Sequence, residues 1–350
     1  MRFWNAVFAR ICALGAHFAR IQKPGNMFRT CEQLLHRNDE GLDYSPCVGP
    51  SVHVKGTTMT TNAHDLVLYR RVGSYLPRVA AVHDLCGYGK CSLGVAIPVL
   101  SAAGCDVCPV PTSLFSAHTR FPKFYMHDTT DMLEGYLDAW VDEGIQLDAV
   151  YSGFLGAPEQ VGAIQRLYRE HPAALRVVDP VMGDGGQKYA TYTDELCDAM
   201  AALVDGADIL TPNLTEASIL TGIPYRGQDV DEAYVRRMLD ALVEKGAKLV
   251  VLKGIVHEGE AVIRNYVAGA GVEFAEVSGE LLPFMLHGTG DLYASSLLAA
   301  VMCGKDVLTS VEFASEFVRD AMRITSAQPD FELRGVSFES ELGKVAALLR

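Results

Sequence analysis

Residues 286–303 read LHGTGDLYASSLLAAVMC, a glycine-bracketed turn followed by an apolar helix rich in small residues. Gly288 and Gly290 lack a Cβ atom, so their backbone can adopt unusual dihedral angles and approach a ligand closely. Thr289 and Asp291 favour a helix start, where the first amides have no partner within the helix. Because these amides lie at the positive end of the helix dipole, the turn predicts a binding site for an anion such as phosphate.

Asp291 is an unexpected residue in such a turn, because its carboxylate would repel a phosphate group. A carboxylate placed there can serve as a general base that takes a proton from an attacking alcohol. The turn would then stabilise a transferred phosphoryl group while Asp291 activates the acceptor. The alternative interpretation is that the GTGD turn only caps a buried helix.

The composition is that of a globular protein able to bury a large core, with 350 residues, 49% of them hydrophobic and 21% charged. The net charge of −13 is unevenly distributed, because residues 1–58 hold seven Lys/Arg against four Asp/Glu. The acidic excess therefore lies in the remainder of the chain. An acidic body is unsuited to binding a phosphate backbone, and we expect no nucleic-acid partner. We expect no membrane partner either, since the apolar runs near the start are too broken for a span.

The nine cysteines have no regular framework spacing, which argues against a disulfide-stapled domain and predicts a reducing compartment, the cytoplasm. Cys86, Cys91, Cys105 and Cys108 show C-x4-C and C-x2-C spacings that zinc and iron–sulfur sites also use. Cys105 and Cys108 fall in a predicted strand, where residues three apart point to opposite faces. We therefore favour free buried thiols over a metal site built from these four residues.

Residues 1–58 differ from the rest of the chain. Residues 1–31 carry five Lys/Arg, interleave Phe and Ile with these charges, and contain no acidic residue, as is typical of an amphipathic targeting peptide. Residues 32–58 have the composition of a polar linker, and a start at Met59 is a second interpretation. We favour an extension that the fold does not need, and assign residues 59–350 to one folded domain.

From Val79 onward, short apolar runs alternate with helical patterns, which indicates an α/β fold with a mostly parallel, helix-covered sheet. The predicted strands are 79–84, 105–111, 147–154, 175–181, 207–213 and 248–254. The predicted helices lie near 90–103, 129–143, 158–170, 192–204, 214–221, 231–245, 309–325 and 339–349. After Gly254 the pattern predicts an antiparallel hairpin, 261–267 and 272–278, near the C-terminal part.

Polar segments follow five of the predicted strands at their carboxyl ends, where open parallel sheets bind ligands. They are HDLCGYG (83–89), SLFSAHT (113–119), SGFLG (152–156), DPVMGD (179–184) and TPNLTE (211–216). Ordinary turn chemistry explains any one of them. Five in succession, followed by GTGD, predict a shared ligand site.

These segments together resemble the pyridoxal/pyridoxamine kinase branch of the ribokinase superfamily over about residues 79–340. LFSAHT (114–119) is similar to a loop that borders the pyridine ring in that branch, and SGFLG resembles a motif that usually reads SGYLG. The resemblance implies a ribokinase-like three-layer α/β/α sandwich and a homodimer. It also implies ATP-dependent phosphorylation of the 5′-hydroxymethyl group of a B6 vitamer (pyridoxal, pyridoxamine or pyridoxine) in vitamin B6 salvage.

The resemblance also implies roles for individual residues. Asp291 would be the catalytic base, and the anion hole would be formed by the amides of Gly288, Thr289 and Gly290. The vitamer would be contacted by Phe115, His118, Thr119, Phe154 and Asp291, and ATP by Asn213, Glu216 and Lys253. Mg²⁺ and its waters would be served by Asp179, Asp184 and Glu216, and a monovalent cation such as K⁺ by Thr211 with Asp179. Mg²⁺ prefers hard oxygen ligands, so these carboxylates suit it on chemical grounds as well.

Asp84 departs from many pyridoxal kinases, which carry a serine near the pyridine ring, whereas HDLCGYG (83–89) resembles sequences described as pyridoxamine kinases. Its carboxylate could pair with a protonated ring nitrogen, pair with a substrate amine, or cap the next helix. A hydroxymethylpyrimidine kinase of the same superfamily is the rival enzyme. A non-catalytic vitamer-binding protein is the alternative from another class.

Overall fold

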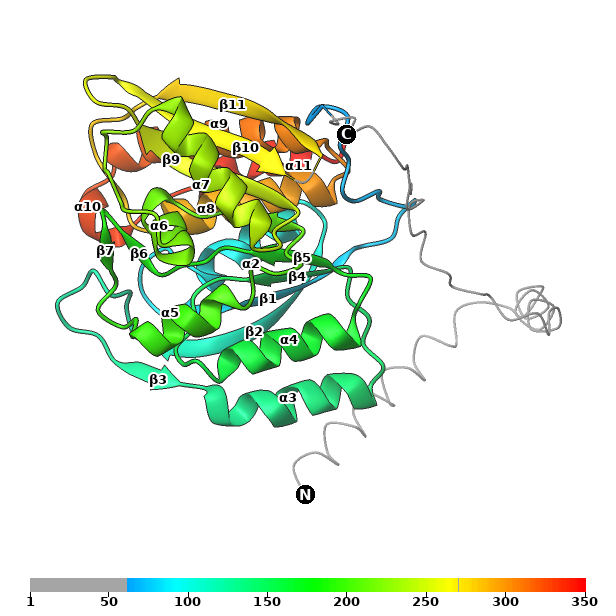
Figure 1. The fold of residues 1–350 in the computed structure, drawn as a ribbon. Helices are drawn as coiled ribbons and strands as arrows, with labels where there is room; N and C mark the ends of the chain where they lie inside the picture. The colour runs from blue at the N-terminus through cyan, green and yellow to red at the C-terminus, as the bar shows by residue number, and fades with distance from the viewer. Residues whose placement is uncertain (1–61, 270) are drawn as a thin grey trace, which may run out of the picture. The chain divides into compact units, whose positions relative to one another are not determined.

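The protein folds as three layers, with a nine-stranded sheet between two layers of helices (Figure 1). The computed structural model describes residues 62–269 and 271–350, so the predictions for residues 1–58 lie outside the described residues. The strand order in the sheet is β11-β10-β9-β8-β5-β4-β1-β2-β3, and β6 and β7 form a separate ribbon. The predicted ribokinase-like α/β/α architecture is confirmed.

The strands alternate with helices along the chain, as predicted. The strands are β1 (Arg78–Cys86), β2 (Asp106–Phe115), β3 (Met126–Asp128), β4 (Ala149–Ser152), β5 (Leu175–Val178), β6 (Gly183–Asp184), β7 (Gln187–Lys188), β8 (Ile209–Leu210), β9 (Leu249–Val256), β10 (Val262–Gly269) and β11 (Val272–Glu280). The helices are α2 (Leu93–Ala102), α3 (Thr130–Asp142), α4 (Gln160–Glu170), α5 (Asp194–Ala201), α6 (Leu214–Thr221), α7 (Glu232–Glu244), α8 (Thr289–Met302), α9 (Val307–Ser326), α10 (Phe331–Arg334) and α11 (Leu342–Ala347).

The sheet is parallel from β2 through β1, β4, β5 and β8 to β9. Strands β10 and β11 continue it as the predicted antiparallel hairpin, in which Val262 pairs with Glu280 and Gly269 pairs with Val272. The short strand β3 closes the opposite edge, antiparallel to β2. Because six neighbouring strands run in one direction, their carboxyl ends meet along one edge of the sheet.

Alternating side chains of the strands supply two separate apolar cores. In β1, Val79 and Ala81 face one core while Ala80 and Val82 face the other, and all four are buried. Helices α3 to α7 cover the sheet face of Ala80 and Val82, and α2, α8, α9 and α11 cover the face of Val79 and Ala81. A strand that is apolar on both faces needs helices on both sides, which explains the three layers.

Helix α8 is buried beyond its first turn, through every residue from Leu292 to Met302. It packs between α2 and α9 and lies against the sheet, where Tyr151 of β4 and Ser295 of α8 place their hydroxyl oxygens 3.3 Å apart. Small side chains allow this close approach on all sides. The GTGD turn therefore rests on a rigid support.

Three features were not predicted from the sequence. Strand β2 continues to Phe115, so the predicted loop 113–119 begins inside a strand and β3 pairs with it. The segment 179–184 ends in the small β6–β7 ribbon. Strands of two or three residues are too short to show a hydrophobic period, which is why the pattern missed them.

Residues 62–77 are the third such feature, and they pack on the domain although no regular element was predicted there. Ala63 is buried, and the carbonyl of Leu66 accepts a hydrogen bond from the Val307 amide at 2.9 Å. Arg71 Nη1 donates to the carbonyl of Ala103 at 2.8 Å. The packed domain therefore begins well before the first strand.

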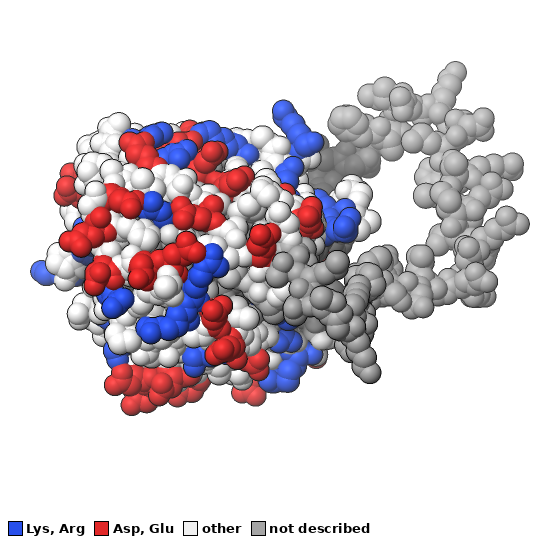
Figure 2. Space-filling view, turned by 45° about the horizontal axis from the view of Figure 1, so that its top comes forward, with Lys and Arg blue, Asp and Glu red and all other residues white. Residues whose placement is uncertain are grey.

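Charged side chains of both signs are interspersed over the face of the protein shown in Figure 2. Within residues 62–269 and 271–350, no helix combines the length and the apolar character needed to cross a membrane.

The docking of residues 62–77 leads to a prediction about truncated chains. A chain beginning at Met59 should keep the melting temperature of the full chain, whereas one beginning at Val79 should melt lower. The second truncation removes buried apolar surface and the Arg71 hydrogen bonds, which should lower the free energy of unfolding by on the order of 2–4 kcal/mol. Thermal denaturation of the three purified proteins checks this, and a destabilised Met59 chain would show that residues 1–58 support the fold.

Candidate active site

A cavity of about 650 Å³ opens at the carboxyl ends of the parallel strands, a size typical of small-molecule sites. It is lined by all five polar segments identified in the sequence and by the GTGD turn. Every predicted site residue lines it except Thr211, which lies behind the wall. The structure therefore brings the predicted residues together, while their individual roles remain predictions.

Gly288 fixes the geometry of the phosphate-binding turn. Its φ of 82° is left-handed, it is the N-cap of α8, and a Cβ at this position would overlap the carbonyl oxygen of Lys90. Thr289 Oγ1 donates to the carbonyl of Leu286 at 3.1 Å, which braces the turn from within. No side chain caps α8, so neither Thr289 nor Asp291 serves as the expected helix cap.

Asp291 faces the cavity from the first turn of α8. Burial and the nearby Asp179 carboxylate raise the pKa of Asp291 to about 7, although a backbone hydrogen bond from Ser92 opposes the increase. A carboxyl group with this pKa is a much stronger base than an ordinary aspartate. It can accept a proton from an alcohol near neutral pH.

Asp179 and Lys253 form a buried ion pair at the centre of the cavity. Asp179 is 1% exposed, and its Oδ1 accepts hydrogen bonds from Lys253 Nζ and from Thr211 Oγ1, the latter at 2.8 Å. Burial alone would lower the pKa of Lys253, but the Asp179 and Glu216 carboxylates raise it above its usual value. Among residues 62–269 and 271–350, the other carboxylate oxygen, Asp179 Oδ2, has no hydrogen-bond partner.

Lys253 also lies beside the phosphate-binding turn. A Cβ placed on Gly290 would be 3.6 Å from Lys253 Nζ. An anion held by the turn would therefore meet the ammonium group, which supports the assignment of Lys253 to ATP.

Glu216 and Asn213 form a capping box at the start of α6. Glu216 accepts hydrogen bonds from the amides of Asn213 at 2.7 Å and Met182 at 3.3 Å, and burial raises its pKa to about 8. Asn213 Nδ2 donates to the carbonyl of Gly183 at 2.8 Å. Both side chains therefore hold the loop that carries Asp184 in place, in addition to any contact with the nucleotide.

Aromatic side chains line another part of the cavity. Phe115 and Phe154 meet edge to face, with ring centroids 5.7 Å apart. The His118 ring lies 4.3 Å from the His287 ring, and it occupies the space that a Cβ at Gly89 would fill. Burial lowers the pKa of His118 and lowers that of His287 to about 4, so both imidazoles are neutral at pH 7.

Asp84 lies at the end of β1, beside this aromatic pocket. It is 4% exposed, and its Oδ2 accepts a hydrogen bond from the Cys86 thiol at 3.3 Å. Helix α2 begins at Leu93 with Ser92 as N-cap, so Asp84 is not its cap. Burial raises the pKa of Asp84, which favours pairing with a cation or a proton.

The family model described as phosphomethylpyrimidine kinase matches residues 96–333. Among curated relatives, a pyridoxine/pyridoxal/pyridoxamine kinase of Bordetella avium is 30% identical over 73% of this chain and 88% of its own length. A pyridoxal kinase PdxY of Actinobacillus succinogenes is 30% identical over 67% of this chain and 84% of its own length. The chain belongs to the pyridoxal kinase branch of the ribokinase superfamily.

Solved structures of this branch agree with that membership. One is an orthorhombic crystal form, with pyridoxal, of a Bacteroides thetaiotaomicron protein assigned to the phosphomethylpyrimidine kinases. It has a TM-score of 0.74 and 33% identity, over 77% of this chain and 96% of its own. The pyridoxal kinase of Lactobacillus plantarum has a TM-score of 0.73 and 28% identity, over 78% of this chain and 98% of its own.

The cavity of this member of the pyridoxal kinase branch is also lined by residues that were not predicted from the sequence to belong to the site. They include Cys86, Cys91, Ser92, Arg120, Tyr189, Thr191, His287 and Arg319. His287 could have been identified, because it directly precedes the GTGD turn. Arg319 could not, because helix α9 reaches the cavity only through its packing on α8 and β11.

The geometry of Gly288 leads to a prediction. Gly288→Ala should destabilise the fold by about 1–3 kcal/mol and reduce turnover about 100-fold, because relief of the overlap with Lys90 displaces the turn. Gly162→Ala in α4 is the matched control, since a Cβ there meets no atom within 4 Å. Chemical denaturation and kinase assays of both variants test this. Wild-type behaviour of Gly288→Ala would show that the turn tolerates a side chain.

Proposed function

We propose that this protein transfers the γ-phosphoryl group of ATP to the 5′-hydroxymethyl group of a B6 vitamer in vitamin B6 salvage. The observation that carries the proposal is the arrangement of one cavity. An anion-binding turn with a basic carboxylate and an aromatic pocket with a buried acid line the same cavity. The named activities of the relatives from Bordetella avium and Actinobacillus succinogenes support the same reaction.

The phosphoryl-transfer end needs positioning and charge stabilisation rather than covalent chemistry. Asp291, with a pKa of about 7, accepts the proton of the hydroxymethyl group as its oxygen attacks phosphorus. The amides of Gly288, Thr289 and Gly290 and the dipole of α8 stabilise the charge on the transferred group. The ammonium group of Lys253 adds a positive charge beside Gly290.

Magnesium suits the residues around Asp179. Asp179 Oδ2 is a buried carboxylate oxygen that has no hydrogen-bond partner in the described part of the chain, and Asp184 and Glu216 add hard oxygen ligands for the ion or its waters. When bound there, Mg²⁺ would neutralise charge on the ATP phosphates. Asn213 keeps the Asp184 loop at this position through its bond to Gly183.

At the predicted K⁺ site, the ammonium group of Lys253 competes with the ion. Thr211 and Lys253 both bond to Asp179 Oδ1, so the lysine supplies a positive charge where K⁺ would bind. A monovalent cation would have to displace this ammonium group or bind beside it.

A cytoplasmic location and a homodimer complete the proposal. Six free cysteines in the described part of the chain support a reducing compartment. The homodimer rests on the family resemblance alone.

Hydroxymethylpyrimidine phosphorylation is the second candidate, and the description of the matching family model favours it. Both substrates present a hydroxymethyl group on a flat nitrogen ring. Comparison of kcat/KM for pyridoxal, pyridoxamine, pyridoxine and hydroxymethylpyrimidine decides between the two enzymes. A chain that binds vitamers without converting ATP to ADP in their presence would instead be a vitamer-binding protein.

The role of Asp291 leads to a prediction with two readouts. Asp291→Asn should lower kcat by about 10²-fold to 10⁴-fold with little change in ATP affinity, because it removes the base and retains the turn. Wild-type kcat/KM should rise with pH through about 7, as Asp291 loses its proton, and the variant should lose this rise. Steady-state kinetics across the pH range measures both.

Stability provides a control for the same variant. Because folding raises the pKa of Asp291 above its unfolded value, ionisation costs stability as pH rises from about 4 to about 7. Asp291→Asn should therefore match the wild type at acidic pH and melt higher above pH 7. Turnover at the wild-type rate would contradict the assignment of the base.

The position of Asp84 leads to a prediction about substrate preference. A charge-assisted hydrogen bond contributes roughly 1.5–3 kcal/mol, and each 1.4 kcal/mol is about tenfold. If Asp84 pairs with the amine of pyridoxamine, Asp84→Ser should lower kcat/KM for pyridoxamine about tenfold or more and affect the other vitamers less. If it pairs with the ring nitrogen, all three should fall together. Unchanged kcat/KM for every vitamer would rule out both pairings.

A further inference from the structure

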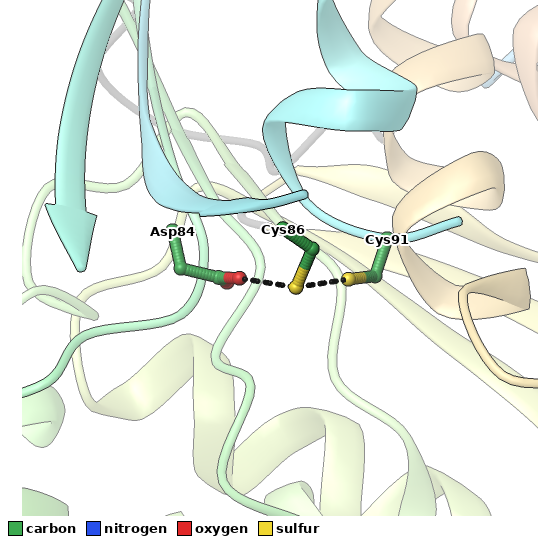
Figure 3. A group of neighbouring side chains, drawn as sticks. All are labelled: Asp84, Cys86 and Cys91. Carbon is green, nitrogen blue, oxygen red and sulfur yellow. Dashed lines mark hydrogen bonds between the residues drawn. The ribbon is translucent and has the colours of Figure 1, made fainter. Parts of the chain in front are cut away.

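Asp84, Cys86 and Cys91 form a compact group of donor atoms in the cavity wall. Cys86 Sγ lies 3.3 Å from Asp84 Oδ2 and 3.1 Å from Cys91 Sγ. The three side chains point toward one another from the end of β1 and the loop before α2 (Figure 3). All three donor atoms lie within 4.8 Å of one another.

This donor group is buried and lacks a cation. The exposed fractions are 4% for Asp84, 9% for Cys86 and 4% for Cys91, and both thiols are free. Within residues 62–269 and 271–350, no Lys or Arg forms an ion pair with Asp84. A buried carboxylate without a countercharge is costly, so a cation at this position would stabilise it.

The donor atoms match a soft divalent ion. Zinc takes cysteine sulfur at about 2.3 Å and carboxylate oxygen at about 2.0–2.2 Å in tetrahedral sites. Such bonds place two sulfurs about 3.7 Å apart, and a sulfur and an oxygen about 3.5 Å apart. The observed separations of 3.1 Å and 3.3 Å need to open by several tenths of an ångström. The donor atoms of Asp84 and Cys91, which lie within 4.8 Å of each other, must come to about 3.5 Å. Mg²⁺, which prefers oxygen ligands, does not suit this donor set.

We propose that Asp84, Cys86 and Cys91 bind a thiophilic divalent cation, Zn²⁺, with its fourth coordination position open to the cavity. All three residues line the cavity, so water or a ligand can reach that position. Binding converts the two thiols to thiolates and releases their protons to solvent. The site is separate from the Mg²⁺ ligands assigned around Asp179.

Because of where this site lies, bound zinc should inhibit the kinase reaction. This expectation rests on the proposed function. Asp84 is the residue proposed to contact the vitamer, so a cation bound to its carboxylate and the vitamer exclude each other. Zinc should therefore raise the apparent KM for the vitamer and leave the KM for ATP unchanged. The ion would act as a competitive inhibitor at the vitamer end of the cavity.

Cobalt titration tests the binding site without vitamer or ATP. The full chain, kept reduced with a phosphine, is titrated with Co²⁺ and then with Zn²⁺. We expect thiolate-to-cobalt charge transfer and the visible absorption of tetrahedral Co²⁺, both abolished when Zn²⁺ displaces the cobalt. Cys86→Ser and Cys91→Ser should lose these bands, and Asp84→Asn should weaken binding about tenfold or more. The control Cys197→Ser removes a buried thiol in α5 and should keep the bands.

Alkylation of the wild-type chain provides a test that needs no variant. Zinc should protect two thiols from iodoacetamide, and peptide mass mapping should assign the protection to Cys86 and Cys91. A measurement on the wild type keeps the proposal testable even where a cysteine variant fails to fold.

Kinetics then tests the consequence. With free Zn²⁺ set by a metal buffer far below the concentrations of Mg²⁺ and ATP, the apparent KM for the vitamer should rise at least tenfold, and a chelator should reverse the change. The ratio of activity with and without zinc should stay the same in Cys197→Ser as in the wild type. It should approach one in Cys86→Ser.

The outcomes separate this proposal from the proposed function. Cobalt bands in a chain without kinase activity would support the metal site and contradict the proposed function. Bands that persist in both Cys86→Ser and Cys91→Ser, or no bands in the reduced wild type, would overturn the metal site. A Cys86–Cys91 disulfide that forms in air, with no cobalt binding after reduction, would also overturn it, because the pair would then be a redox couple.

Discussion

The buried ion pair between Lys253 and Asp179 is the interaction on which the cavity depends. Asp179, Glu216, Asp291 and Asp84 all line one cavity, and like charges in a buried space raise the cost of ionising each of them. Lys253 opposes this repulsion, because its positive charge acts to lower the pKa values of Glu216 and Asp291 against the effect of burial. The ion pair also joins Asp179, directly after β5, to Lys253 within β9 across the intervening strand β8.

The sheet places these acids together at little cost in core packing. The strands bury apolar side chains on both faces, and the polar residues of the site lie toward the carboxyl ends of the parallel strands. Helix α8 lies buried between α2, α9 and the sheet, so the turn at its start cannot move independently. A turn held this rigidly can present its amides to a phosphoryl group without reorganisation, which is the condition for effective charge stabilisation.

The cavity is left with more negative charge than its own residues neutralise. Within the described residues, Asp179 Oδ2 has no hydrogen-bond partner, and the groups that donate hydrogen bonds to Asp84 include the neutral side chains of Cys86 and Ser92. Positive charge can therefore enter at two separate places. A hard ion that also binds phosphate oxygens suits the place beside Asp179, whereas a protonated vitamer or a soft metal ion suits the place beside Asp84. Competition for the second place would connect vitamer phosphorylation to the availability of a thiophilic metal.

The sequence by itself determined the order of the longer strands and helices, the buried helix after the GTGD turn and the set of segments that share one cavity. Hydrophobic periodicity and strand-end polarity are local signals, so they can be read from neighbouring residues. Tertiary structure decided the rest. Asp179 and Lys253 are 74 positions apart and meet only because β5, β8 and β9 align. The contact of Cys86 with Cys91 depends on the turn between β1 and α2. The raised pKa of Asp291 depends on burial and on the Asp179 carboxylate, and the residues next to Asp291 in the sequence determine neither of these.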